Sequence, residues 1–103
     1  MKTFLYVTAI AALFFAGAVS ARAPQVESAE LTLSAPAAKA EYIIDGALWK
    51  CQETACRAAF VDDMPAFRSC KRVVTITGAV TSFTWRGKAL TESEIAVCNT
   101  RAK

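Results

Sequence analysis

Hydrophobic and polar residues alternate on both sides of the dipeptide Asp45-Gly46. Alternation with a period of two is typical of a strand with one buried face, and Asp-Gly between two such runs favours a hairpin with a two-residue turn. This turn fixes the register of the two strands. The expected cross-strand pairs include one aromatic pair and one pair of opposite charge, and they are Ile44–Ala47, Ile43–Leu48, Tyr42–Trp49 and Glu41–Lys50.

A second turn, over residues 52–55, extends this hairpin to a three-strand meander and places Cys51 opposite Cys56. Because successive side chains of a strand point to opposite faces, we expect one face of the meander to lie on the core. The residues of that face are Tyr42, Ile44, Ala47, Trp49, Cys51, Cys56, Ala58 and Phe60. The opposite face carries Glu41, Lys50 and Arg57 with Ile43, Leu48 and Ala59.

The segment after the meander has the features of an amphipathic helix. Residues 62–65, Asp-Asp-Met-Pro, are typical of a helix start, with an aspartate as N-cap and proline in the first turn. Two sets of residues then recur at steps of three and four on opposite sides: Phe67, Cys70, Val74 and Thr77 against Arg68, Lys71, Arg72 and Thr75. A strand over residues 73–77 is the competing interpretation, because that run is entirely β-branched and Gly78 follows it. The amphipathic spacing favours the helix.

Residues 80–86 predict a further strand. Their side chains alternate, so that Thr81, Phe83 and Trp85 share one face, and Gly87-Lys88 then turns the chain. This strand joins the meander in a small antiparallel sheet.

The C-terminal residues predict a second short helix. Thr91 and Glu94 have the spacing of a capping box, in which each side chain satisfies a backbone amide of the other. We expect this helix to bury Ile95 and Cys98 and to stop at Asn99. The elements together predict an α+β fold, in which a three-strand meander, a fourth strand and two short helices are held together by disulfides.

The N-terminal end has the layout of a secretory signal peptide. Lys2 precedes an apolar run over residues 4–19, and small residues follow it. We place the cleavage after Ala21, with Ser20 as the alternative. The apolar run is shorter than the roughly 20 residues that a membrane-spanning helix needs, and no second apolar stretch is long enough. We therefore expect an exported protein, periplasmic or secreted, with no membrane span after cleavage.

The sequence divides into three parts. Residues 1–21 are the expected signal peptide, and residues 22–39 are a flexible leader rich in Ala, Pro and Ser. Within this leader, Glu30–Ser34 is a candidate for a short edge strand. Residues 40–103 are a single small domain, and domains of this size commonly need disulfides because their core is modest.

The charge of the chain is nearly balanced. Of the 12 lysines and arginines only Lys2 lies in the signal peptide, so eleven basic residues accompany nine acidic ones in the remainder. No cluster of basic residues is larger than Lys71-Arg72. Nucleic acid is therefore not an expected partner.

Four cysteines are the main candidates for chemistry. The chain has no histidine, and Cys70 and Cys98 lie far from the Cys51–Cys56 pair, so the spacing of a zinc site is missing. Redox catalysis usually needs a Cys-x-x-Cys pair at a helix start. Directly opposed residues of paired strands, in contrast, have the separation that a disulfide requires. We predict the bridges Cys51–Cys56 and Cys70–Cys98; loop entropy does not separate them from the crossed pairing, and strand geometry favours them.

Several short motifs are shared with a known group of proteins. They are Trp49-x-Cys51, Cys56, Cys70, the hexapeptide of residues 78–83, Gly87 and the closing Ala96-Val-Cys98-Asn99. In these motifs the chain resembles a family of small exported proteins of unknown function from alphaproteobacteria, which have a signal peptide, a leader and four cysteines. The resemblance implies export and disulfides. It implies no activity, cofactor or catalytic residue.

A binding or interaction module is the function that these features favour. Trp85, Arg86 and Lys88 place an aromatic ring beside two cations at a strand end, which suits a glycan, an anionic lipid head group or an envelope protein. The competing interpretation is that Trp85 fills the core, as tryptophans usually do. We expect neither a metal nor another cofactor.

Two other classes are weaker. Without histidine, an enzyme would depend on carboxylates, and the pairs Asp62-Asp63 and Glu92/Glu94 lie at expected helix starts, where acidic residues are common for structural reasons. A carboxylate-dependent hydrolase is thus the less expected class. An inhibitor or accessory subunit is the alternative, with residues 53–55 between the bridged cysteines as its exposed loop.

Overall fold

The meander predicted around Asp45-Gly46 is present with the expected register. The computed structural model describes residues 26–103, and the predicted signal peptide, residues 1–21, lies outside them. The three strands are β2 (Glu41–Ile44), β3 (Ala47–Gln52) and β4 (Ala55–Ala58). Tyr42 pairs with Trp49 across the first hairpin, as the turn predicts.

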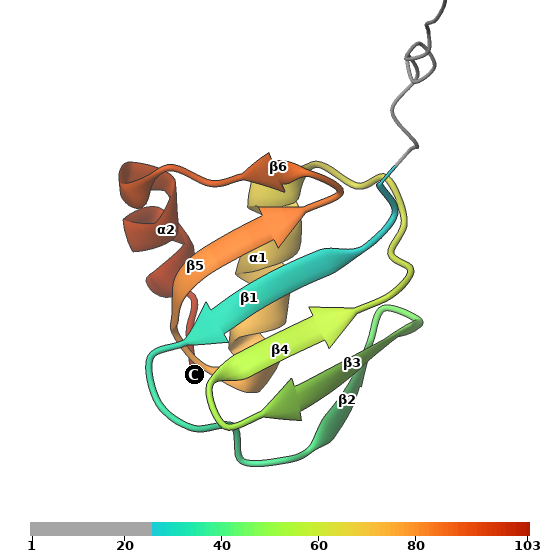
Figure 1. Ribbon diagram of the computed structural model, residues 1–103. Coiled ribbons are helices and arrows are strands. Elements are labelled where there is room, and N and C mark those ends of the chain that lie inside the picture. The colour runs from blue at the N-terminus through green and yellow to red at the C-terminus, as the bar shows by residue number, and fades with distance from the viewer. Residues whose placement is uncertain (1–25) are drawn as a thin grey trace, which may run out of the picture.

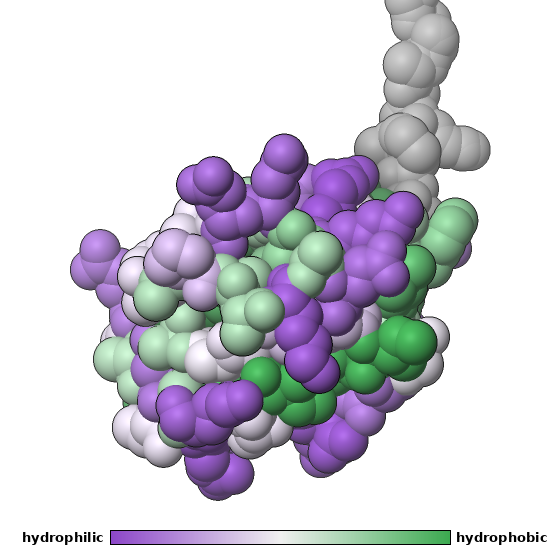
Figure 2. All heavy atoms as spheres, turned by 90° about the horizontal axis from the view of Figure 1, so that it is seen from below, coloured by the Kyte–Doolittle hydropathy of each residue, from purple (hydrophilic) through white to green (hydrophobic). Residues whose placement is uncertain are grey.

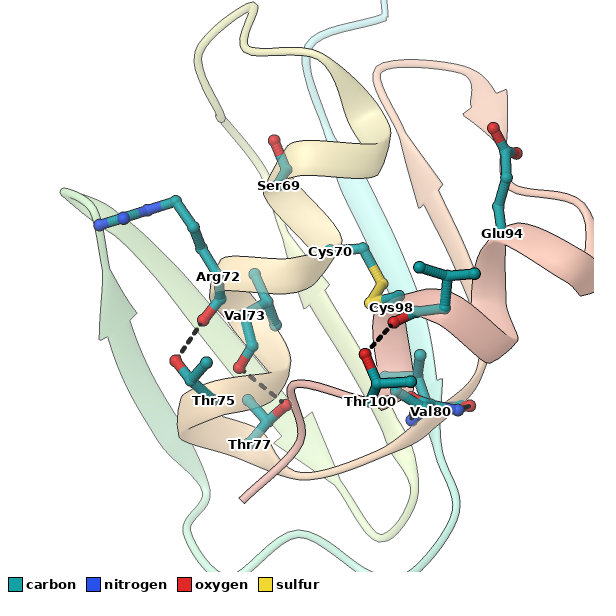
Figure 3. Close-up of a disulfide and its surroundings, with 12 residues drawn as sticks. Ser69, Cys70, Arg72, Val73, Thr75, Thr77, Val80, Glu94, Cys98 and Thr100 are labelled. Atoms are coloured by element: carbon teal, nitrogen blue, oxygen red, sulfur yellow. Dashed lines mark hydrogen bonds between the residues drawn. A yellow bond between two sulfur atoms is a disulfide. The ribbon is translucent and has the colours of Figure 1, made fainter.

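The meander is half of a six-stranded antiparallel sheet with the order β2-β3-β4-β1-β5-β6. The remaining elements are β1 (Ala29–Leu33), α1 (Ala66–Thr77), β5 (Val80–Trp85), β6 (Lys88–Ala89) and α2 (Glu92–Asn99). Figures 1 and 3 show α1 and α2 side by side on one face of the sheet. The predicted α+β class is confirmed, and the other face of the sheet is left open.

β1 corrects the predicted leader. We expected a flexible leader to residue 39 and at most an edge strand within it, but β1 lies in the middle of the sheet, between β4 and β5. Ala29, Leu31 and Leu33 are each at most 3 % exposed. The reason is their alternation with Glu30 and Thr32, which gives β1 one apolar face although the surrounding composition is that of a linker. The domain therefore begins before residue 40.

The predicted helix exists, but it starts later than the sequence indicates. α1 runs through the β-branched residues to Thr77, because Val73 and Val74 are buried against the sheet, and burial outweighs helix propensity. The N-cap is Pro65, without a side-chain hydrogen bond. Asp62 does not cap the helix; its Oδ1 accepts from the backbone amide of Met64, 3.2 Å away, in a local turn.

The strand over residues 80–85 also differs in one detail. A register shift opposite Thr32/Leu33 turns Val80 rather than Thr81 to the core, while Phe83 and Trp85 face inward as predicted. The turn that follows is centred on residues 86–87, one position earlier than predicted.

The second helix begins and ends as predicted. Thr91 and Glu94 form the capping box, Cys98 is fully buried and Ile95 is half-buried. Asn99 ends α2. Its side-chain Oδ1 accepts from the backbone N–H of Val80 at 2.9 Å, and its Nδ2 donates to the carbonyl of Val80 at 2.8 Å. These two bonds fasten the end of α2 to the start of β5.

Three aromatic rings form the centre of the core. The Trp49 centroid lies 6.5 Å from that of Phe83 and 6.4 Å from that of Trp85. Phe60, in contrast, was expected on this face and is 72 % exposed. It lies beyond the end of β4, where the alternation of a strand no longer sets the direction of its side chain.

Candidate functional site

The open face of the sheet carries a row of polar side chains. The strand registers align one residue from each of five strands, in the order Thr84, Glu30, Arg57, Lys50 and Glu41. All four charged members are exposed. Their charges run negative, positive, positive, negative across the sheet, so the two cations lie in the middle of the row.

Two charges of this row, Lys50 and the Glu41 directly opposite it, form no ion pair among residues 26–103. Arg57 lies directly opposite Lys50 on the other side, which is unfavourable for two like charges. Arg57 donates through Nη1 to Glu30 and forms an ion pair with it. Among residues 26–103 the other ion pair joins Arg72 to Asp45. The ammonium of Lys50 therefore has no carboxylate partner within this part of the chain.

The row crosses a hollow of about 670 Å³, which we call the sheet hollow. Besides the charged residues, Thr32, Gln52 and Ser82 line it. The Cys51–Cys56 disulfide also borders it and joins two strands whose Cα atoms at this point are 4.0 Å apart. Paired strands and a disulfide hold the backbone beneath these side chains in place, so the floor of the sheet hollow is preformed.

An apolar pair lies on the same face, next to the charged row. Ile43 and Leu48 are cross-strand partners, and they are 75 % and 45 % exposed. Figure 2 views the molecule from the end where β2 and β3 lie in Figure 1, and shows strongly hydrophobic side chains in a band bordered by hydrophilic ones. Exposed apolar groups beside polar ones are typical of surfaces that bind other proteins.

Both predicted disulfides are present. Cys51 is bonded to Cys56 and Cys70 to Cys98, and the described residues contain no free cysteine. Figure 3 shows the second bridge joining α1 to α2. The part of the chain that the structure covers holds no group of three or more potential metal ligands.

A family model matches residues 9–100, which is most of the chain, and it describes a family of unknown function (DUF8200). The chain belongs to this family. No curated protein and no solved structure matches the chain. The expectation of a family of unknown function with four cysteines in two disulfides is thereby confirmed.

The recognition residues predicted for this DUF8200 chain do not form one surface. Trp85 is only 8 % exposed, stacks on Phe83 with 6.0 Å between ring centroids, and donates its indole N–H to a backbone carbonyl at 3.1 Å. Arg86 donates Nη1 to the carbonyl of Val61, 2.9 Å away. Lys88 alone is exposed, on β6. Trp85 thus fills the core, as the competing interpretation holds.

The two carboxylate pairs have local structural contacts. Asp62 accepts from the backbone in the turn before α1. Glu94 accepts from the amide of Thr91 at 2.9 Å, as part of the capping box, and Glu92 lies in the same helical turn. Glu94 thus has a structural role at the start of α2, whereas Asp62 stabilises a turn before α1 and not the helix itself.

Backbone hydrogen bonds from residues 33 and 37 hold the loop between the bridged cysteines. The carbonyl of Thr54 accepts from Leu33 N, and the carbonyl of Glu53 accepts from Ala37 N, both at 2.7 Å. The segment after β1 therefore packs along this turn. An inhibitor that inserts a projecting loop would need these backbone groups to be available, whereas both carbonyls already accept hydrogen bonds from within the chain.

The sequence prediction missed the contribution of β1 to the open face. Glu30 and Thr32 line the sheet hollow, but the leader interpretation placed them outside the domain. Their alternation with Ala29, Leu31 and Leu33 was the signal that could have revealed them. None of the helices in the described region of this DUF8200 chain has the length and apolar character needed to cross a bilayer.

Proposed function

We propose that this member of the DUF8200 family is an exported, disulfide-stabilised module that binds another protein through the open face of its sheet, without catalysis. The observation that carries the proposal is the combination on that face of a hollow with a preformed floor, an unpaired Lys50 and the exposed pair Ile43 and Leu48. This combination supplies both an apolar contact and a charge that selects a partner.

The chemistry of the face indicates the chemistry of the partner. Covering Ile43 and Leu48 removes apolar surface from water, which is the main favourable term in protein association. A carboxylate that enters the sheet hollow can pair with Lys50, whose ammonium forms no ion pair among residues 26–103 and lies beside the like-charged Arg57. The partner therefore presents an apolar group next to an acidic side chain.

The disulfides and the N-terminal pattern support the proposed place of action. Disulfides form and persist in oxidising compartments and are rare in the cytosol. The signal-peptide pattern of residues 1–21 and the resemblance to small exported alphaproteobacterial proteins support the same location. The partner is then a protein of the periplasm or the cell envelope.

Affinity capture from the organism's own envelope tests the proposal. The oxidised chain is used as bait beside an Ile43→Thr/Leu48→Thr double variant, in which both positions keep residues that favour strands. We expect the wild-type chain to retain a specific protein and the double variant to bind it about tenfold more weakly, because each methyl or methylene group lost from a buried contact costs about 0.8 kcal/mol and about 1.4 kcal/mol is tenfold in affinity. The purified pair gives the two dissociation constants.

Val97→Thr is the matched control. Val97 is also exposed, by 51 %, but it lies on α2, away from the open face. It should leave the affinity unchanged, whereas Lys50→Gln should weaken binding and reduce its dependence on salt. The proposal fails if no protein is retained above background, or if Val97→Thr weakens binding as much as the face variant does.

A further inference from the structure

The outer side of α1 is basic, and no acidic residue of the same helix offsets its positive charge. α1 carries the cations Arg68, Lys71 and Arg72 and no acidic residue. Their spacing of three and four places them on adjacent turns of one side of the helix, with β-carbons about 5 to 6 Å apart. Like charges at this spacing destabilise a helix slightly, and α1 has no acidic residue to offset them.

A fourth cation reaches the same side from the end of the chain. The segment after α2 folds back along α1, where Lys103 N donates to the carbonyl of Val74 at 3.4 Å and Ala102 packs against the core. Arg101 thereby lines a hollow of about 770 Å³ together with the three cations of α1. We call it the basic hollow; Asp45 is the only acidic residue of its lining.

Asp45 already forms an ion pair with one of these cations. Arg72 donates Nε and Nη2 to the two carboxylate oxygens of Asp45, each at 2.6 Å, and Figure 3 shows the Arg72 side chain extended away from α1. Arg68, Lys71 and Arg101 form no ion pair with any residue between 26 and 103. Lys71 lies over the ring of Phe67, 4.4 Å from its centroid. Three positive charges thus remain unneutralised around one hollow.

We propose that the basic hollow binds the phosphate group of a phosphorylated ligand. Guanidinium groups offer planar, paired donors that match phosphate oxygens, and a lysine adds a point charge. A phosphate carries one negative charge as a diester and close to two as a monoester, and it offers several acceptor oxygens to the three uncompensated cations. Ile76, which is 40 % exposed, and the half-buried Met64 supply apolar contacts beside them. This site lies on the helix side, away from the sheet hollow, and is independent of the proposed protein-binding face.

Titration of the oxidised chain, followed by the backbone amide signals in NMR, tests this site. Inorganic pyrophosphate is one probe, and vesicles of zwitterionic lipid with and without an anionic phospholipid are the other, all compared with sodium chloride at equal ionic strength. We expect saturable shifts for residues 68–76 and 101–103. Saturation by pyrophosphate identifies a soluble phosphorylated ligand, and binding to anionic vesicles alone identifies a lipid head group; either result supports the site.

Variants on two segments make the test specific. Arg68→Gln with Arg101→Gln removes two exposed cations that no described ion pair uses, and should weaken binding about tenfold, as expected for lost charge-assisted hydrogen bonds. Asp45→Asn removes the single acidic charge and should tighten binding about twofold to fivefold. Lys39→Gln, which removes an exposed cation outside both hollows, is the control and should change nothing.

The proposal is overturned by three results. They are shifts that sodium chloride reproduces at equal ionic strength, absence of saturation with both probes, and equal weakening by Lys39→Gln and by the double variant. Near-ultraviolet circular dichroism of each variant shows whether the fold is intact, so that a loss of binding is not confused with unfolding.

Discussion

Asp45 has two structural roles, one in a backbone turn and one in an ion pair. Asp45 and Gly46 have φ values of 50° and 83°, which suit a two-residue turn with both central residues in the left-handed region. The carboxylate of Asp45 meanwhile receives two hydrogen bonds from Arg72. One residue therefore sets the register of the β2–β3 hairpin and ties the hairpin to α1.

The Asp45–Arg72 pair predicts a dependence of stability on pH. The hydrogen bond and charge of Arg72 lower the pKa of Asp45 below its ordinary value of 3.8, although partial burial opposes the shift. The folded chain therefore favours the carboxylate more than the unfolded chain does. The pair stabilises fully above pH 3.8, and its contribution is lost as the pH falls through the lowered pKa.

Comparison with Asp45→Asn measures this contribution, because Asn-Gly preserves the turn. Urea denaturation should show the wild-type chain slightly more stable at neutral pH, since both side chains are partly exposed. The difference should disappear in strong acid. A difference that is constant with pH would show that the charge of Asp45 is not its cause.

At the scale of elements, β1 determines whether the sheet is continuous. It is the only described strand that joins the meander to the hairpin of β5 and β6. Its two faces serve different purposes, because Leu31 and Leu33 complete the core, whereas Glu30 and Thr32 line the sheet hollow. The stability of the fold and the shape of the open face thus depend on the same five residues.

Leu31→Ala is therefore expected to destabilise the chain by about 2 to 5 kcal/mol, the usual cost of truncating a buried leucine. Leu48→Ala is the matched control, because Leu48 is 45 % exposed whereas Leu31 is 3 % exposed. It should cost less than about 1 kcal/mol. Equal urea midpoints for the two variants would contradict the central position of β1.

Elements with a local signal were predictable from the sequence, and those that depend on distant partners were not. Asp45-Gly46 and the Thr91–Glu94 capping box define their own geometry within a few residues. β1 shows only a short alternation, which does not identify its partners, because β4 and β5 lie far along the sequence. The sheet hollow was missed for the same reason, since Glu30 and Thr32 belong to β1.

At the scale of the whole molecule, two disulfides stabilise different parts of a small fold. Cys51–Cys56 closes a turn, with a sequence separation of 5, and Cys70–Cys98 joins the two helices, with a separation of 28. Cys70 and Cys98 are also fully buried, whereas Cys51 is half-buried. Because it closes the longer loop, the bridge between the helices restricts more of the unfolded chain.

Replacement of each pair by alanines should show this difference. Loop entropy gives about 3.6 kcal/mol for Cys70–Cys98 and about 2 kcal/mol for Cys51–Cys56. We expect the Cys70→Ala/Cys98→Ala variant to have the lower midpoint in urea, and intact mass before and after reduction verifies the bridge that remains. The reverse order of midpoints would mean that the turn, and not the contact between the helices, limits stability.

The central place of the first strand also has a consequence for the order of folding. Leu31 pairs with Cys56 on one side and with Phe83 on the other, so β1 precedes both of its partners during synthesis. Pairings between distant segments form slowly, because a long loop must close before any contact is gained. The six-stranded sheet cannot assemble until β5 has been made. An emerging N-terminal half therefore lacks one of the two partners of β1.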